Sequence, residues 1–299
     1  MKAILVHGSV ETSCAKPYLA SLRRAALAGY RALEAGPLDA VERSVMALED
    51  TPLFNAGYGS VLNLEGEAEM DAAIMDGATG RCGAVAAIQE VKNPVCVARK
   101  VMEETPHVLL AGKGATHFAR HMGFAPFNPV TNQQRGFWEK ALSAQERNQN
   151  QPFSAFTGFP KSCDTVGCVA VKNGYSAAAS STGGTFLKLP GRVSDTPVIG
   201  GGIYASSYGA VVCTGMGETF IRNQTASCVL NMIARGISLQ AATTAAIQRL
   251  VGEKIIGGIL AIDTAGNCAA LHNAHSFPVV FVIDGKIVKG FTSTRIPLA

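Results

Sequence analysis

The sequence lacks several short patterns that mark common binding sites. Its eight cysteines never form a C-x-x-C pair, so it carries no zinc signature. No G-x-G-x-x-G follows a strand-like run and no Walker loop is present, which argues against nucleotide binding. Lysine and arginine are scattered, and the net charge is only +4. The sequence therefore indicates no nucleic-acid partner.

Long apolar runs are also absent. The first residues, MKAILVHG, hold four consecutive apolar residues after one lysine, which is too short for the apolar region of a signal peptide. No segment reaches the roughly 20 apolar residues that a helix needs to span a bilayer. We therefore expect a soluble, cytoplasmic protein with no membrane partner. Apolar residues still make up 47% of the 299 residues, enough for a sizeable core.

Apolar periodicity predicts both helices and strands in each half of the chain. The helices are expected at 16–34, from 37 to about 48, at 92–104, 113–123, 217–235 and 238–250. The strands are expected at 2–8, 68–77, 82–90, 107–112, 165–171, 175–182, 209–215, 257–263, 267–273, 279–283 and 286–291. Because strands follow one another directly, the pattern favours antiparallel sheets covered by helices.

Residues 124–162 differ from the rest of the chain. They contain Asn, Gln, Pro, Ser and Phe with no sustained period. We interpret this segment as a flexible linker within a single domain of residues 1–299.

The linker leads to Asp164-Thr165, at the start of a buried strand. A threonine hydroxyl is a poor nucleophile unless a base lies within hydrogen-bond reach. A threonine at a chain end carries its own base, because its α-amino group has a pKa of roughly 7.7–8. A cut between the two residues would supply that amino group. The four letters DTVG alone are more typical of a turn that enters a strand.

Three later stretches strengthen the catalytic interpretation. Thr182 ends the next predicted strand, and Thr214 and Gly215 end another strand just before a helix. Strand ends and helix starts are places where hydroxyls and backbone N–H groups converge on an oxyanion. Arg192 and Asp195 lie three residues apart in a glycine-rich loop. A surface ion pair between them would contribute little.

Taken together, these stretches resemble the plant-type asparaginase/isoaspartyl peptidase family, which are threonine N-terminal-nucleophile (Ntn) hydrolases. The matching motifs are HG at 7–8, ALEDTPLFNAGYGSV at 47–61, EMDAAIMDG at 69–77, GAVAAI at 83–88, KNPVCVARKVME at 92–103, TPHVLLAG at 105–112, DTVG at 164–167, STGG at 181–184, LPGRVSDTPVIGGG at 189–202, CTGMGE at 213–218 and GGILAID at 257–263. So many motifs in order are more specific than any one of them.

The resemblance implies an α/β fold, a four-layer αββα sandwich with antiparallel sheets. It implies a precursor cut between Asp164 and Thr165 into an α chain, 1–164, and a β chain, 165–299. Thr165 would then attack the side-chain carbonyl of asparagine or of a β-aspartyl dipeptide. Thr182 would help to activate it, and Thr214 with Gly215 would form the oxyanion hole.

The resemblance assigns substrate binding to Arg192 for the α-carboxylate and Asp195 for the α-ammonium, with Thr214, Gly215 and Gly217 lining the pocket. Asn55 would support the nucleophile. No cofactor is implied for catalysis. A structural sodium ion is implied in the turn that includes Asn55, which a plain glycine turn explains equally well. Its backbone ligands would be Leu48, Glu49, Thr51, Phe54, Ala56 and Tyr58.

The sequence departs from the family at four places. HGSVE replaces the usual HGGAG, Ser194 replaces a glycine, Thr185-Phe186-Leu187 is more apolar than usual, and LHNAHSFPV replaces the usual C-terminal stretch. These departures leave the leaving group open, and Phe186 with Leu187 favours an apolar or bulky one.

Two alternatives stay open. One is a glycosylasparaginase-like or threonine-aspartase-like hydrolase, and the other is an uncleaved, non-catalytic binding or scaffold relative. By resemblance, the protein would pair as a homodimer of αβ units.

Overall fold

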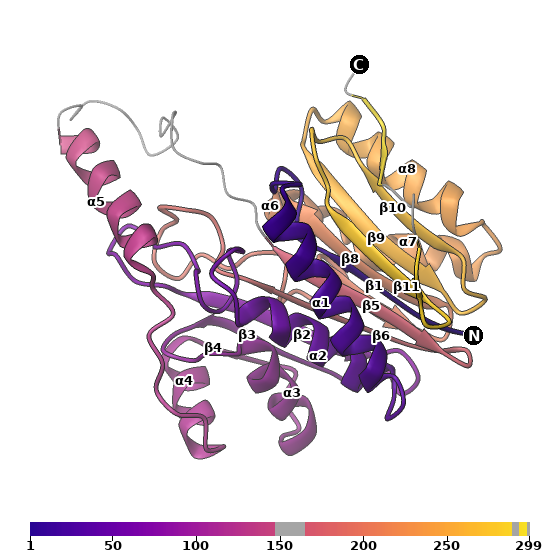
Figure 1. Ribbon diagram of the computed structural model, residues 1–299, viewed down its shortest axis with the longest axis horizontal. Helices are drawn as coiled ribbons and strands as arrows, with labels where there is room; N and C mark the ends of the chain where they lie inside the picture. The colour runs from indigo at the N-terminus through magenta and orange to yellow at the C-terminus, as the bar shows by residue number, and fades with distance from the viewer. Residues whose placement is uncertain (147–164, 289–292, 298–299) are drawn as a thin grey trace.

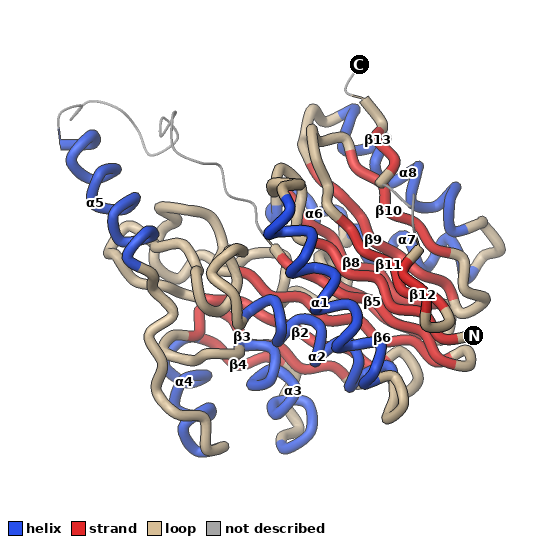
Figure 2. The backbone as a smooth tube through the Cα atoms, viewed as in Figure 1, coloured by secondary structure: helices blue, strands red, loops and turns tan. Residues whose placement is uncertain are grey.

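The computed structural model describes residues 1–146, 165–288 and 293–297, and it contains helices and two mixed β-sheets of the α/β class (Figures 1 and 2). The described strands are β1 (Lys2–His7), β2 (Met70–Asp76), β3 (Cys82–Ile88), β4 (Leu109–Ala111), β5 (Val166–Lys172), β6 (Tyr175–Thr182), β7 (Ile203–Ser206), β8 (Gly209–Gly215), β9 (Gly257–Asp263), β10 (Cys268–His272), β11 (Val279–Ile283), β12 (Lys286–Ile287) and β13 (Thr294–Arg295). The larger sheet has the order β12-β11-β1-β5-β6-β2-β3-β4, and the smaller has the order β13-β10-β9-β8-β7.

Most of the described helices flank these sheets. They are α1 (Lys16–Ala32), α2 (Pro37–Glu49), α3 (Pro94–Glu104), α4 (Gly112–His121), α5 (Asn132–Glu146), α6 (Gly217–Asn223), α7 (Thr225–Ala234) and α8 (Leu239–Gly252). Proline occupies the first turn of α1, α2 and α3, where its missing N–H costs no helical hydrogen bond. Ser238 caps α8 by accepting from the N–H of Ala241.

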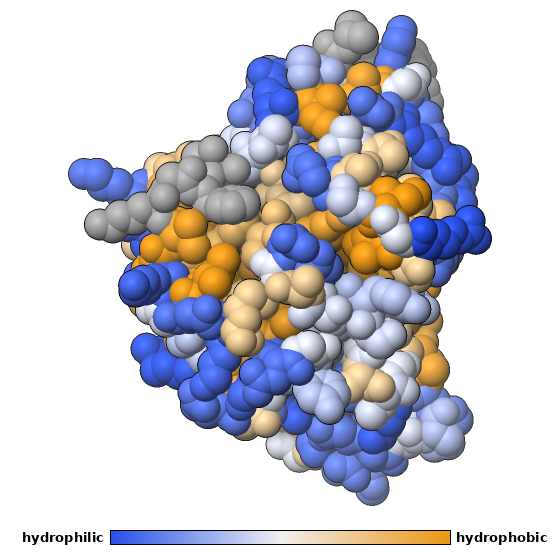
Figure 3. All heavy atoms as spheres, turned by 90° about the vertical axis from the view of Figure 1, so that its right-hand side faces the viewer, coloured by the Kyte–Doolittle hydropathy of each residue, from blue (hydrophilic) through white to orange (hydrophobic). Residues whose placement is uncertain are grey.

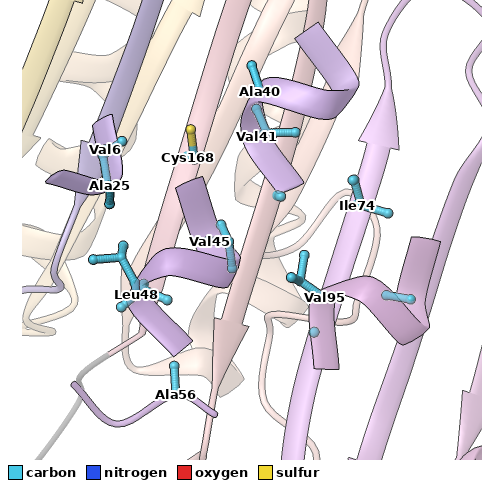
Figure 4. Packing of buried hydrophobic residues seen from close by; sticks show 14 of the residues in the cluster. Val6, Ala25, Ala40, Val41, Val45, Leu48, Ala56, Ile74, Val95 and Cys168 are labelled. Atoms are coloured by element: carbon cyan, nitrogen blue, oxygen red, sulfur yellow. The ribbon is translucent and has the colours of Figure 1, made fainter. Parts of the chain in front are cut away.

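Strand β1 explains how both faces of the larger sheet become buried. Its residues Ile4 and Val6 join a core cluster with α1 and α2 on one face, and Figure 4 shows part of that cluster. Ala3 and Leu5, which point the other way, join a second cluster with the smaller sheet. The two sheets therefore contact each other directly, as β5 with β8 and β6 with β7. A third cluster packs the smaller sheet against α7 and α8.

The expectation of antiparallel sheets is wrong in one respect, since each sheet contains one parallel pair. Strand β3 runs parallel to β4, and β10 runs parallel to β13. The first pair is joined through α3, a connection long enough for the chain to return in the same direction. The sheets are therefore mixed, and the other pairs of neighbouring strands in the two sheets are antiparallel as expected.

The segment 124–162 also contains structure that periodicity did not predict. Residues Asn132–Glu146 form α5, which projects from the rest of the chain in Figure 1. Its sequence is rich in Gln, Arg, Glu, Lys and Ala, which favour helix without an apolar stripe. Residues 147–162 of the predicted linker lie outside the described residues.

The surface mixes apolar and polar residues. On the face in Figure 3, apolar residues form separate patches, and the lower part is mostly polar. Over the described ranges, no helix combines the length and apolar character that crossing a bilayer requires.

Candidate active site

The predicted nucleophile lies where β5 and β2 begin and β6 ends, at one end of three neighbouring strands of the larger sheet. Thr165 precedes β5 directly and is 6% exposed. Val166 pairs with Ser181, so Thr165 lies one step further in that register, opposite Thr182. Thr182 pairs in turn with Asp71 of β2. The fold therefore brings Thr165 and Thr182 together, as the sequence analysis expected.

The hydroxyl of Thr182 is oriented by the turn that follows it. The N–H of Gly184 donates to Thr182 Oγ1 at 3.0 Å. Asn55 holds this turn, because its Nδ2 donates to the Gly184 carbonyl at 2.7 Å and its own carbonyl accepts from Gly183 N–H at 2.8 Å. Since Thr182 Oγ1 already accepts one hydrogen bond, its O–H proton is left to donate in another direction. Asn55 therefore fixes the turn that follows Thr182, and its support of the nucleophile stays a prediction.

The predicted oxyanion-hole residues end β8 in the smaller sheet. Thr214 is fully buried, and β8 contacts both β5 and β6. Gly215 has φ +136°, and a Cβ added there would lie 2.5 Å from the Ile256 carbonyl oxygen and 2.7 Å from Gly257 Cα. Only glycine fits this backbone conformation and this close approach.

Asn273 fixes the strand that lies beside Gly215. Its Oδ1 accepts from Gly257 N–H at 2.8 Å, and its Nδ2 donates to the Ile255 carbonyl at 2.7 Å. Gly257 is the register partner of Gly215. The sequence analysis did not assign a role to Asn273, because its partners lie 16 to 18 residues away in the chain.

A second hydroxyl lies beside Thr214. Ser9 Oγ is 2.6 Å from Thr214 Oγ1, and the N–H of Ser9 donates to His7 Nδ1 at 3.1 Å. His7 is fully buried, and burial lowers its pKa to about 3. The imidazole is therefore neutral near pH 7, so Nδ1 can accept. The sequence analysis registered Ser9 only as part of a departure from the family motif.

The structure also brings together Arg192, Asp195 and Gly217, which the resemblance assigns to substrate binding and which we call the clamp residues. A Cβ added to Gly217 would lie 2.8 Å from Asp195 Oδ1 and 3.3 Å from Arg192 Nη2. Glu218 pairs with Arg192, with its Oε1 at 2.9 Å from Nε and 2.8 Å from Nη2. Arg192 therefore has a partner that the sequence analysis did not identify, and its guanidinium is held beside Asp195.

Asp195 is buried with an unsatisfied carboxylate oxygen. The residue is 2% exposed, and its Oδ2 makes no hydrogen bond to the described part of the chain. Burial raises its pKa to about 7, and a backbone hydrogen bond and the charge of Arg192 oppose that rise. A buried acceptor of this kind is suited to a cationic ligand, because an unpaired buried charge is costly.

Glu69 anchors the first part of the loop that carries the clamp. Its carboxylate accepts from Gly191 N–H at 2.9 and 3.0 Å. Its carbonyl accepts from Lys188 Nζ at 2.8 Å, and the same ammonium donates to the Arg192 carbonyl at 3.1 Å. Lys188 is 5% exposed, and burial lowers its pKa. This buried lysine thus joins β2 to the clamp loop.

Asp71 anchors the other end of that loop. Its Oδ2 accepts from Ser194 N–H and its Oδ1 from Ala87 N–H, both at 2.8 Å. The sequence analysis quoted EMDAAIMDG without assigning Glu69 or Asp71 a role. The signal was available, since two carboxylates at the start of a buried strand need partners.

The predicted sodium loop is a tight turn built from backbone contacts. The Leu48 carbonyl accepts from Thr51 N–H at 3.2 Å, and the Glu49 carbonyl accepts from Tyr58 N–H at 2.8 Å. A carbonyl oxygen has two lone pairs, so both remain compatible with a hard cation. Within the described ranges, no group of three His, Cys, Asp or Glu side chains could hold a metal. A site of backbone oxygens is a different kind of site, and it stays a prediction.

Two cavities lie near these elements. One, of about 230 Å³, is lined by Asn55 and by aromatic side chains that include Phe54, Phe137 and Phe186. The other, of about 480 Å³, is lined mainly by 66–68, 89–90 and 126–130 and contains none of the predicted catalytic residues. The first cavity is the nearer of the two to Thr182 in one respect, since Asn55, which lines it, holds the turn after Thr182. Asp164 of the predicted cleavage site lies outside the described residues.

Comparison with known proteins agrees with the motifs. Residues 1–288 match the asparaginase family. A plant-type L-asparaginase from Pyrococcus furiosus is 44% identical, over 95% of this chain and 97% of that protein. One from Pyrococcus abyssi is 43% identical with the same coverage. An isoaspartyl peptidase/L-asparaginase from Rattus norvegicus is 40% identical, over 92% of this chain and 84% of that protein. The chain belongs to the asparaginase family.

Proposed function

We propose that this chain is a self-processing amidohydrolase that cleaves the side-chain amide of L-asparagine and the isopeptide bond of β-aspartyl dipeptides. The relatives named above support this activity and substrate class. The observation that carries the proposal is the register of the larger sheet, in which Thr165, just before β5, lies opposite Thr182 at the end of β6. The Arg192, Asp195 and Gly217 cluster supports a substrate with a free amino-acid end.

The chemistry begins with hydrolysis of the peptide bond before Thr165, in which water leaves a carboxylate on Asp164 and frees the α-amino group of Thr165. That amine takes the proton from Thr165 Oγ as the oxygen attacks the substrate carbonyl carbon. Thr214 and the N–H of Gly215 hold the oxyanion of the tetrahedral intermediate. The C–N bond then breaks, and the departing nitrogen takes the proton from the amine. Water attacks the resulting ester, and aspartate leaves.

Each end of the substrate has a matching group. The guanidinium of Arg192 binds the α-carboxylate, since its planar fork fits two carboxylate oxygens. The α-ammonium binds Asp195, whose Oδ1 faces Gly217 and whose Oδ2 makes no hydrogen bond to the described residues. The cavity beside Asn55 and Phe186 accepts a leaving group larger than ammonia.

We further propose the four-layer αββα arrangement of Ntn hydrolases as the fold. The three core clusters support it, since helices pack on each sheet and the sheets pack on each other. Processing would give an α chain of 1–164 and a β chain of 165–299, which pair as a dimer of αβ units. The 48–58 turn would bind a structural sodium ion. Light scattering of the purified protein measures the assembly state.

The test is the fate of the purified chain on incubation. We expect intact mass to give two fragments, the smaller beginning at Thr165, and the cut protein to hydrolyse both L-asparagine and β-aspartyl-leucine. Thr165→Ala should stay one chain and be inactive. An uncut chain that is nevertheless active would overturn the mechanism, and an uncut, inactive chain would favour the scaffold alternative.

A glycosylasparaginase-like enzyme is the second candidate among hydrolases. It predicts hydrolysis of the bond between an asparagine side chain and a sugar. Competition between such a glycosylasparagine and β-aspartyl-leucine on the cut protein separates the two activities. We expect the dipeptide to be the better substrate.

A further inference from the structure

Ser9 adopts a backbone conformation that suits glycine better than serine. Its φ is +82°, and its side chain is fully buried. A residue with a Cβ adopts this region at a cost, and such residues gather at functional sites. Neighbouring bonds fix the conformation, because Gly8 N–H donates to the Pro278 carbonyl and Ser9 N–H to His7 Nδ1. The strain is thus held by the surrounding structure.

The strained position places the Ser9 hydroxyl against a functional group of the proposed site. Ser9 Oγ lies 2.6 Å from Thr214 Oγ1, and both side chains are fully buried. This bond joins the end of β1 in the larger sheet to the end of β8 in the smaller one. A hydroxyl has only one proton to donate. The Thr214 proton can therefore point to an oxyanion only if Ser9 is the donor in the bond between the two hydroxyls.

We propose that Ser9 is a positioning residue for the oxyanion hole: its O–H donates to Thr214 Oγ1, and this turns the Thr214 proton toward the substrate oxyanion. The inference rests on the proposed function of Thr214. Hydrogen bonds in a chain polarise one another, so the Thr214 proton also becomes a better donor. Ser9 acts on the transition state and lies apart from the clamp residues, so it affects kcat and leaves KM unchanged.

Ser9→Gly tests the proposal because it removes the hydroxyl and relieves the strain together. A purely structural serine would give a variant that is as stable or more stable, with wild-type kcat. We expect equal or higher resistance to urea, a kcat lower by about tenfold and a KM within twofold, measured with β-aspartyl-leucine on protein cut before Thr165. The matched control is Asn173→Gly, which relieves a positive φ of +51° in the exposed turn between β5 and β6, away from Thr214.

A double-mutant cycle with Thr214→Val assigns the effect. Ser9→Gly should cost about tenfold in the wild-type background and nothing further in the Thr214→Val background. A Ser9→Gly variant with wild-type kcat overturns the proposal, and so does an undiminished effect when the Thr214 hydroxyl is already removed. If the cut wild-type protein hydrolyses neither asparagine nor β-aspartyl-leucine, the proposed function itself fails. An active wild type with an unaffected Ser9→Gly variant overturns only the role of Ser9.

Discussion

The two sides of the candidate site are built from different chemistry. We call one the clamp side, and it consists of Glu69, Asp71, Lys188, Arg192, Asp195 and Glu218. We call the other the oxyanion side, and it consists of Ser9, Thr214, Gly215, Gly257 and Asn273. The clamp side is held by carboxylates and cations, whereas the oxyanion side is held by hydroxyls, an amide and close backbone contacts.

The difference follows from what each side would have to recognise. The amino-acid end of the proposed substrate carries full charges, and opposite charges must be placed against them at the cost of burial. The oxyanion exists only briefly, so fixed dipoles stabilise it without binding the ground state equally well. The clamp side should therefore depend on charge and pH, and the oxyanion side on shape.

The largest effect should come from removing the cation of the clamp side. Arg192→Met should lower kcat/KM for β-aspartyl-leucine by roughly 10²–10³-fold, because it leaves the α-carboxylate and Glu218 without their partner. Steady-state kinetics measures this change. Arg222→Met, on the same helix as Glu218, is the control and should change little. A loss below threefold at Arg192 would contradict the clamp.

The oxyanion side should instead fail by a change of shape with no change of charge. Gly215→Ala should lower the free energy of unfolding by about 3 kcal/mol, since a Cβ there meets the Ile256 carbonyl at a φ of +136°. Urea unfolding measures it. Gly252→Ala, which meets nothing within 4 Å at the end of α8, should be neutral or slightly stabilising. An equal loss of unfolding free energy at Gly215 and Gly252 would contradict the claim that the oxyanion side depends on close backbone contacts.

Asp71 tests whether a carboxylate is needed to hold the clamp loop. Asp71→Asn should cost about 2 kcal/mol of stability and raise KM for asparagine, because one of its two N–H partners would face an NH₂ group. Asp76→Asn in the same strand is a matched control, since Asp76 accepts two hydrogen bonds at a more exposed turn. Similar losses at both positions would show that loop anchoring is not special to Asp71.

The sequence predicted the elements that bury apolar residues and the residues of the site that belong to local motifs. Strand β1, helices α1 to α3 and the strands that carry Thr182 and Thr214 follow from periodicity, because each spans enough residues for the pattern to emerge. The helix predicted at 217–235 is interrupted at Gln224, which has φ +47° and divides α6 from α7. No single letter there distinguishes a break from a continuous helix.

The contacts that hold the site could not be predicted from local sequence patterns. Ser9 and Thr214 are 205 residues apart in sequence, and Asp71 and Ser194 are 123 apart. Such pairs depend on strand order, which periodicity does not give. Helix α5 was missed for a different reason, since its apolar residues form no clear stripe. Its Trp138 instead donates from the indole to the Asn63 carbonyl.

The smallest predicted effect is a pH dependence confined to the clamp side. Burial raises the pKa of Asp195 to about 7, so its carboxylate is mostly ionised at pH 8 and mostly protonated at pH 6. Only the ionised form attracts the α-ammonium of the product, L-aspartate. The Kd of L-aspartate for the cut protein, measured by calorimetry, should therefore rise about tenfold from pH 8 to pH 6, which is a loss of about 1.4 kcal/mol in binding free energy.

Succinate provides the matched ligand for this measurement, because it has both carboxylates of aspartate but no ammonium. Protonation of Asp195 removes a negative charge that repels succinate, so its binding should hold or improve as the pH falls. Opposite trends for the two ligands would assign the titration to Asp195 and the ammonium. Parallel trends would mean that another group, such as the Thr165 amine, sets the pH dependence. The clamp side and the oxyanion side would then not differ in their dependence on pH.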